Sequence, residues 1–173
     1  MRSGHESIGL KSFHSIPEIT KDLLSRNFLL RKKAREELVE IGEPSLDFLI
    51  ELATSKDEKV RWEAIITIVQ IGSLETLDVL LNALRDEEFS IRWLAAEGLI
   101  NLGKFVILPV LQELQSNPDS GFIRRGAHHV LHELKKTGVF KDEYGLVEQL
   151  GNEFDHSGIP VKVQKTLDLI RFN

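Results

Sequence analysis

The 173-residue sequence contains no cysteine, and this absence excludes disulfide bonds, thiolate metal sites and cysteine nucleophiles. We read no apolar stretch of 18 residues in it, and its start, MRSGHESIGLKS, lacks the apolar run of a signal peptide. The lack of cysteine favours a reducing compartment. We therefore expect a cytoplasmic protein without a membrane partner.

Basic residues are also in deficit. The chain has 22 Lys and Arg against 27 Asp and Glu, which gives a formal net charge of −5. A protein with this balance has no overall field that attracts a polyanion. Hydrophobic residues make up 42% of the chain, enough for one soluble domain with a continuous core. We expect a single domain that does not bind nucleic acid.

The sequence does contain a pattern that occurs four times. Its clearest copy is KVRWEAIITIVQIG, from Lys59 to Gly72. The other copies are LRKKAREELVEIG, IRWLAAEGLINLG and IRRGAHHVLHELK, the last with Lys135 in place of the final glycine. The anchoring arginines, spaced by 30, 31 and 32 residues, are Arg31, Arg61, Arg92 and Arg124. Self-similarity at this period predicts a solenoid of stacked helix pairs.

Each copy has the periodicity of an amphipathic helix. With the arginine counted as position 0, positions −1, +3, +7 and +10 share one stripe at about 100° per residue. Position +3 is alanine in every copy, and a small side chain there allows a neighbouring helix to approach closely. In the second copy the stripe consists of Val60, Ala64, Ile68 and Ile71.

Both ends of these helices carry stop signals. Position −4 holds residues that suit a helix N-terminus, namely Asn27, Asp57, Glu88 and Ser120. Glycines that can adopt the left-handed conformation follow three of the four copies, namely Gly42, Gly72 and Gly103.

A second helix precedes each arginine-bearing helix, because aliphatic residues recur 15 and 12 positions before the arginine, starting with Ile16 and Ile19. We therefore expect residues 1–15 to be a leader and residues 16–173 to be one repeat domain. After Leu134 the period loosens, and we interpret residues 139–173 as a degenerate fifth pair, with Lys162 at position 0, that caps the core. The prediction is about ten helices in five pairs, without a sheet.

Over residues 16–138 this pattern resembles the HEAT repeat, especially the short phycobilisome-lyase-type HEAT-like repeats of about 30 residues. The resemblance implies an all-α fold, namely a right-handed α-solenoid (an armadillo-like alpha-alpha superhelix) of about five HEAT-like pairs. It also implies that the arginine-bearing helices line the concave face of this solenoid. It also implies bonds between arginines and acidic residues from repeat to repeat. The residues that match this ladder are Asp57, Arg61, Asp86, Arg92 and Arg124, while Ser55 and Pro118 break the first acidic position.

Positions +1, +2, +5 and +9 lie away from the core stripe, and we expect them to face solvent on the concave side. Position +1 is Trp62 and then Trp93 in consecutive copies, and Glu63 stands at +2. The two rings form one aromatic patch or, alternatively, fold over neighbouring helices as local packing. The predicted partner-binding residues are Trp62, Ile66, Phe89, Trp93, Glu97, Phe122, Arg125 and His129.

Three histidines, His128, His129 and His132, share one predicted helix, but HHVLHE is not the HExxH zinc motif, and we predict no metal site. We also see no catalytic residues and no cofactor motif. The leading interpretation is a non-catalytic scaffold that binds a protein or peptide in its concave groove. Two alternatives stay open: a phycobilin-lyase-like accessory factor that holds a flat conjugated cofactor, and, more remotely, a HEAT-like DNA glycosylase. Glutamates outnumber basic residues on the inferred inner face, which counts against the glycosylase.

Overall fold

The structure, a computed structural model, describes residues 15–152 and 154–172. Of the expected leader, 1–15, only Ser15 lies within the described residues, where its backbone N–H donates to the Glu18 carboxylate at the first helix. The described residues form ten α-helices and three 3₁₀ helices, without a strand. The α-helices are α1 (Ile16–Leu23), α2 (Phe28–Ile41), α3 (Leu46–Leu52), α4 (Glu58–Ile71), α5 (Leu77–Ala83), α6 (Phe89–Leu102), α7 (Ile107–Ser116), α8 (Gly121–Lys136), α9 (Leu146–Gly151) and α10 (Ile159–Phe172). The 3₁₀ helices are η1 (Glu43–Ser45), η2 (Leu74–Thr76) and η3 (Gly103–Val106).

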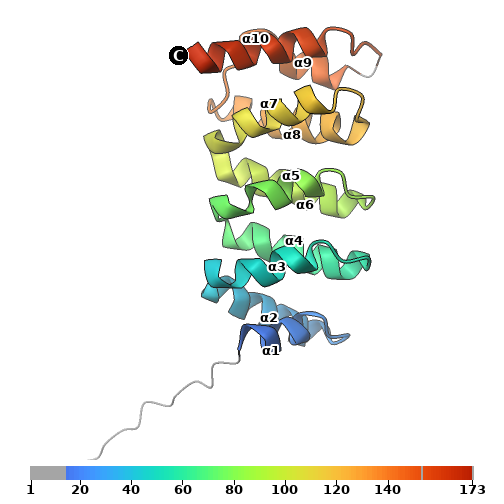
Figure 1. The fold of residues 1–173 in the computed structure, drawn as a ribbon, viewed down its shortest axis with the longest axis vertical. Coiled ribbons are helices and arrows are strands. Elements are labelled where there is room, and N and C mark those ends of the chain that lie inside the picture. Colours follow the sequence, from blue (N-terminus) through green and yellow to red (C-terminus); the bar gives the residue numbers. More distant parts are fainter. Residues whose placement is uncertain (1–14, 153, 173) are drawn as a thin grey trace, which may run out of the picture.

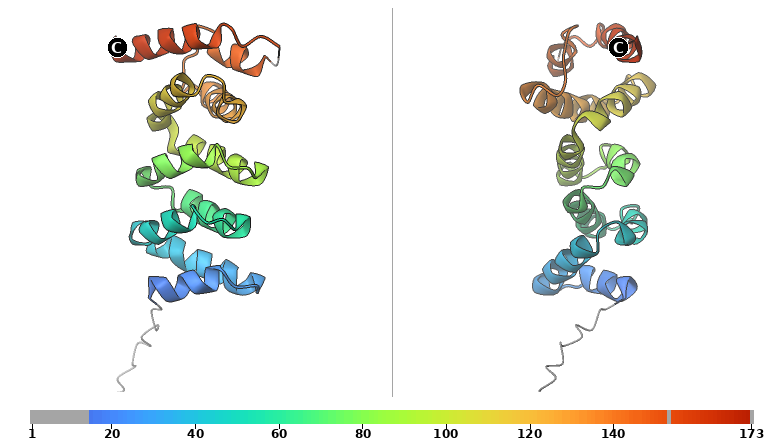
Figure 2. Two further views of the ribbon diagram at one scale, coloured as in Figure 1. Left: turned by 45° about the vertical axis from the view of Figure 1, so that its right-hand side comes forward. Right: turned by 90° about the vertical axis from the view of Figure 1, so that its left-hand side faces the viewer.

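Consecutive helices pair, and the five pairs stack along one axis (Figure 1), as the repeat predicts. Helices α2, α4, α6 and α8, which carry the repeated arginines, contact one another from pair to pair and form the arginine row. Helices α1, α3, α5 and α7 form a second row beside it (Figure 2). The predicted α-solenoid is confirmed.

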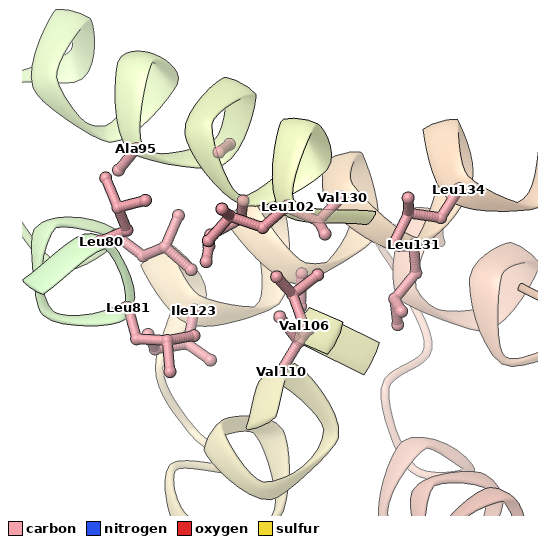
Figure 3. Packing of buried hydrophobic residues seen from close by; sticks show 14 of the residues in the cluster. Leu80, Leu81, Ala95, Leu102, Val106, Val110, Ile123, Val130, Leu131 and Leu134 are labelled. Carbon is pink, nitrogen blue, oxygen red and sulfur yellow. The ribbon is translucent and has the colours of Figure 1, made fainter. Parts of the chain in front are cut away.

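The core lies between the two rows, where the sequence places its apolar stripe. All four alanines at position +3 are buried, and so are all four aliphatic residues at position +7. The +7 residues have no exposed surface and are Leu38, Ile68, Leu99 and Leu131. They belong to one buried cluster with aliphatic side chains of the second row, such as Leu80 and Val110, and Figure 3 shows the middle of this cluster. This continuous apolar contact stabilises the stack.

The helices α2, α4 and α6 end at the predicted glycines, but only Gly72 adopts the left-handed conformation; Gly42 and Gly103 combine a positive φ with ψ of −137° and −136°. Three N-cap side chains accept a backbone N–H of the first turn: Asn27, Asp57 and Ser120. Glu88 makes no such bond. Gly72 ends α4 with φ of 68° and ψ of 26°, a conformation that favours glycine. Where Lys135 replaces this glycine, α8 continues to Lys136 and a positive φ occurs only at Gly138.

The fifth pair exists, but its helices lie in the opposite order to the expected one. We expected the helix that contains Lys162 to continue the arginine row. Instead, α9 packs on α8, and α10 packs on α7 in the second row (Figure 2). A hydrogen bond of 2.8 Å from Gln115 to Gln164 joins α7 to α10.

The connection between α8 and α9 explains this exchange of rows. Phe140 is buried, and the Asp142 carboxylate accepts hydrogen bonds from the backbone N–H groups of Leu146 and Val147. Asp142 also pairs with Lys135 near the end of α8, at 2.9 Å. The connection is thus held beside α8, so that the next helix begins over α8 instead of crossing to the second row.

The stretch Phe89–Ser116 is more apolar than we expected, since its length and composition alone would allow it to cross a membrane. In the structure it is not one continuous α-helix but α6, η3 and α7. Both α-helices contribute residues to the core, among them Leu99 and Leu111. Its apolar composition is therefore explained by its place in the middle of the solenoid.

Replacing Ala64 or Ala95 with leucine should lower the free energy of unfolding by about 1–3 kcal/mol, because neither side chain has exposed surface and the neighbouring helices leave no room. Chemical denaturation measures this loss. The control is Gln70→Leu on the exposed side of α4, which should change the free energy by less than about 0.5 kcal/mol. A larger loss for the control would contradict the observed helical register.

Candidate interaction surface

The repeated arginines first hold the turn that precedes their own helix. The Nη1 group of Arg31, Arg61 and Arg92 donates to the two carbonyl oxygens six and five residues earlier, at 2.6–3.2 Å. The acceptors are Ser25 and Arg26, Ser55 and Lys56, and Asp86 and Glu87, respectively. Each of these arginines therefore fixes the turn between the two helices of its pair.

The second repeat also shows the expected bond to the next repeat. Arg61 donates from Nε and Nη2 to the two carboxylate oxygens of Asp86, at 2.7 and 2.9 Å. Burial opposes ionisation of Asp86, but hydrogen bonds from Arg61 and from the Glu88 N–H outweigh it and hold the pKa of Asp86 below its ordinary value. Asp86 is thus an ionised carboxylate that joins two repeats.

In the first repeat the acidic partner is a different residue. Arg31 donates to Glu63 at 2.7 Å, and Arg35 donates to the same carboxylate at 2.6 Å. Our expectation that Glu63 faces solvent is therefore wrong: its side chain is buried between helices, where two arginines compensate the loss of hydration. Asp57, expected in the ladder, instead caps its own helix through the Lys59 N–H.

At the third arginine, contacts with aromatic rings replace the ion pair to the next repeat. The position equivalent to Asp86 is Pro118, which cannot accept a side-chain ion pair. Arg92 Cζ instead lies 4.3 Å from the centroid of the Phe122 ring and 5.8 Å from that of Phe89. Arg124 donates to Nδ1 of His156 at 3.2 Å. Within the described residues, the last two repeat arginines form no ion pair with an acid.

Aromatic rings gather around Arg92 on α6 and α8. Trp93 stacks on His129 of the next repeat at 4.5 Å between ring centroids, and Phe89 lies 6.3 Å from Trp93. Nε2 of His129 lies 2.8 Å from the Glu97 carboxylate, which orients the imidazole beneath the indole. The Trp93 patch, as we name this surface, consists of Phe89, Arg92, Trp93, Glu97, Phe122, Arg125 and His129.

The rings of the Trp93 patch are open to solvent. Trp93 is 48% exposed, Phe89 67% and Phe122 39%. Exposed aromatic groups that touch one another form an apolar surface of the kind that marks interaction sites. Six of the eight residues predicted from the sequence belong to this patch. The seventh member, Arg92, was assigned only to the ladder, although Pro118 in the acceptor position was a signal of its different role.

Trp62 and Ile66, the other two predicted residues, lie apart from the patch. Trp62 is partly buried, packs against the core and lies 5.9 Å from Arg35 Cζ. Its ring makes no aromatic contact with Trp93 in the described part of the chain. It borders a separate groove of about 910 Å³ at the N-terminal ends of α2, α4 and α6. Ile66 is likewise partly buried.

The groove beside Trp62 is lined by charges of both signs. Its walls include Arg26 and Lys59 as well as Asp57, Glu58 and Glu88, and the Arg31–Glu63 ion pair also borders it. Neither positive nor negative charge dominates in the groove, and Arg31 and Glu63 already neutralise each other. The groove therefore has less defined recognition chemistry than the Trp93 patch.

The histidines of α8 take separate roles. His129 belongs to the patch, whereas the rings of His128 and His132 lie 5.8 Å apart outside it. Burial and the nearby charges of His132 and His129 lower the pKa of His128, so it is neutral at pH 7. Within residues 15–152 and 154–172, no three His, Asp or Glu side chains lie close enough to hold a metal ion.

A solenoid of short helix pairs tied by repeated arginines defines the class of this protein. The family model of HEAT repeats matches residues 16–100. Residues 16–100 are therefore HEAT repeats, and the later helix pairs continue the same HEAT-like solenoid. Among solved structures it is similar to the complex of CpcE and CpcF of phycocyanin lyase from Nostoc sp. PCC7120, with 23% sequence identity and a TM-score of 0.59. That alignment covers 87% of this chain and 96% of the other, and it shows a shared fold. None of the curated proteins matches the sequence.

Replacing Asp86 with alanine should lower the free energy of unfolding by about 2–4 kcal/mol, because Arg61 and the Glu88 N–H lose their acceptor. Chemical denaturation at pH 7 tests this value. A carboxylate with a lowered pKa stabilises the folded state at neutral pH and loses that contribution in acid. The difference between the variant and the wild type should therefore shrink as the pH falls below about 4.

The matched control is Glu40→Ala, which removes the same charge from an exposed position on α2. It should change the free energy of unfolding by less than about 0.5 kcal/mol. Equal effects of the two variants would show that the contact between Arg61 and Asp86 does not stabilise the stack.

The two tryptophans should differ in fluorescence, because Trp93 is exposed and Trp62 is partly buried. Trp62→Phe leaves only Trp93, whose emission should be red-shifted and readily quenched by acrylamide. Trp93→Phe leaves only Trp62, whose emission should be bluer and less quenched. Indistinguishable spectra would contradict the separate environments of the two rings.

Proposed function

We propose that this protein is a non-catalytic interaction module that binds a protein or peptide partner through the Trp93 patch. The observation that carries the proposal is the contact between exposed Trp93 and His129 of the next repeat, at 4.5 Å. Tryptophan and arginine are the side chains that most often contribute large shares of binding energy at interfaces. The patch joins both kinds in one place.

The patch is supported by rigid neighbours. Its residues come from α6 and α8, which contact each other within the arginine row. Glu97 orients His129, and His129 in turn supports the face of the Trp93 ring. Side chains that are already held in place lose little conformational freedom when a partner binds. This arrangement favours a binding role over incidental exposure of aromatic rings.

The similar solved structure supports the same class of function. That structure is a complex of two proteins, CpcE and CpcF. We infer by analogy that this chain also uses its solenoid to assemble with another protein, and we expect this to take place in the cytoplasm. An excess of acidic residues continues to disfavour a nucleic-acid partner.

The second candidate is an accessory factor that holds a flat conjugated pigment against Trp93. The observation that favours it is the shared fold with a phycocyanin lyase complex. An absorption spectrum of a linear tetrapyrrole mixed with the purified protein separates the two candidates. A spectral shift that is lost in Trp93→Ala would favour the pigment, and an unchanged spectrum would favour the protein partner.

Affinity capture tests the proposed function. The wild-type chain and the Trp93→Ala variant are immobilised and exposed to the same lysate, and the retained proteins are compared by mass spectrometry. We expect Trp93→Ala to lose specific partners while it stays folded, because removal of an exposed ring creates no cavity. Circular dichroism checks that the variant is folded.

The matched control is Phe105→Ala in η3, which removes an aromatic ring that is 55% exposed outside the patch. This variant should retain the same partners as the wild type. Partners that survive Trp93→Ala but are lost with Phe105→Ala would place the binding surface elsewhere.

A further inference from the structure

Two arginines of the Trp93 patch lie on one aromatic ring. Arg92 Cζ is 4.3 Å and Arg125 Cζ is 5.4 Å from the centroid of Phe122. Within the described residues neither forms an ion pair with an acid. Their positive charges are therefore concentrated beside an exposed apolar surface, in a chain whose net charge is negative.

A comparison with Arg61 shows which part of Arg92 is unused. In both residues Nη1 donates to the carbonyls of the preceding turn. Arg61 then holds both oxygens of Asp86 with Nε and Nη2. The same two nitrogens of Arg92 make no hydrogen bond within the described residues. The ring of Phe122 supports the Arg92 guanidinium, and the edge formed by Nε and Nη2 has no acceptor among the residues that the structure describes.

Three carboxylates in the turn before α6, on α6 and on α7 are already engaged. Asp86 belongs to Arg61, and Glu97 belongs to His129. Glu113, at the end of α7, pairs with Arg85. Within the described residues, Nε and Nη2 of Arg92 bind no acceptor, so a carboxylate of another molecule can bind there. A carboxylate fits this edge because the equivalent edge of Arg61 binds one with two hydrogen bonds.

We infer that the partner presents an acidic peptide segment, in which an Asp or Glu side chain binds Arg92 and Arg125 and a neighbouring apolar side chain packs on Trp93. This inference rests on the proposed function and specifies the chemistry of the same site. Phe89 and Phe122 extend the apolar surface beside the arginines, so aromatic or leucine residues next to the acid are favoured. Charge complementarity selects this occupant over a basic or purely polar segment.

A random-peptide display library selected on the immobilised wild-type chain tests the inference. We expect enriched peptides to combine Asp or Glu with Phe, Trp or Leu. Fluorescence anisotropy of the selected peptides should show at least a tenfold loss of affinity for Arg92→Gln/Arg125→Gln, since hydrogen bonds to charged groups are lost. Replacing the Asp or Glu of the peptide with Asn or Gln should lower the affinity for the wild-type chain by the same factor. The same peptide change should lower the affinity for the double variant little, because that variant has already lost the interaction.

Two further variants make the result specific. Arg125→Gln alone should weaken binding without disturbing the fold, because Arg125 makes no hydrogen bond within the described residues. Lys104→Gln is the matched control: Lys104 is also a cation over an exposed ring, that of Phe105 at 5.4 Å, but it lies outside the patch. This control should bind the peptides with wild-type affinity.

The outcomes separate the inference from the proposed function. Peptides that lose binding to Trp93→Ala, yet carry no acid and bind the arginine variants normally, would overturn the acidic-segment inference alone. Selected peptides that bind Trp93→Ala as tightly as the wild type would contradict the proposed function itself. Loss of binding in the arginine variants that is equal to the loss in Lys104→Gln would show a general charge effect and would also overturn the inference.

Discussion

The hydrogen bonds of one repeated guanidinium group hold the parts of this solenoid in register. At three successive repeats the arginine donates to two carbonyls of its own turn, and at the first two it also binds a carboxylate of the next repeat. Apolar burial drives the pairs together but has no direction. The arginine supplies the direction, because its planar guanidinium group donates hydrogen bonds only at defined angles. Helix pairs can therefore stack with a constant offset.

The same side chain has a second role where its acidic partner is missing. Arg31 and Arg61 pair with acids within the protein, whereas Arg92 lies on Phe122 and Arg124 contacts Nδ1 of His156. The repeated arginines thus form ion pairs with an acid of the next repeat in the first two repeats, whereas Arg92 and Arg124 contact rings. Our proposed interaction surface begins where this change occurs. An arginine that lacks the acidic partner of its equivalents in other repeats can bind a group of another molecule.

The fifth pair departs from the order of the first four. The short α9 packs on α8, and the longer α10 packs on α7. The anchored connection around Asp142 directs this exchange.

The sequence alone determined the number of pairs, the helix ends and the core stripe, because these depend on periodicity and on local capping chemistry. It also named six of the seven residues of the Trp93 patch. Only the tertiary structure decided that Glu63 is buried between two arginines, that Trp62 lies apart from Trp93, and that α9 rather than α10 continues the arginine row. These outcomes depend on which side chains of different repeats come within hydrogen-bonding or stacking distance. A helical period specifies the face of a residue but not its partner across a neighbouring helix.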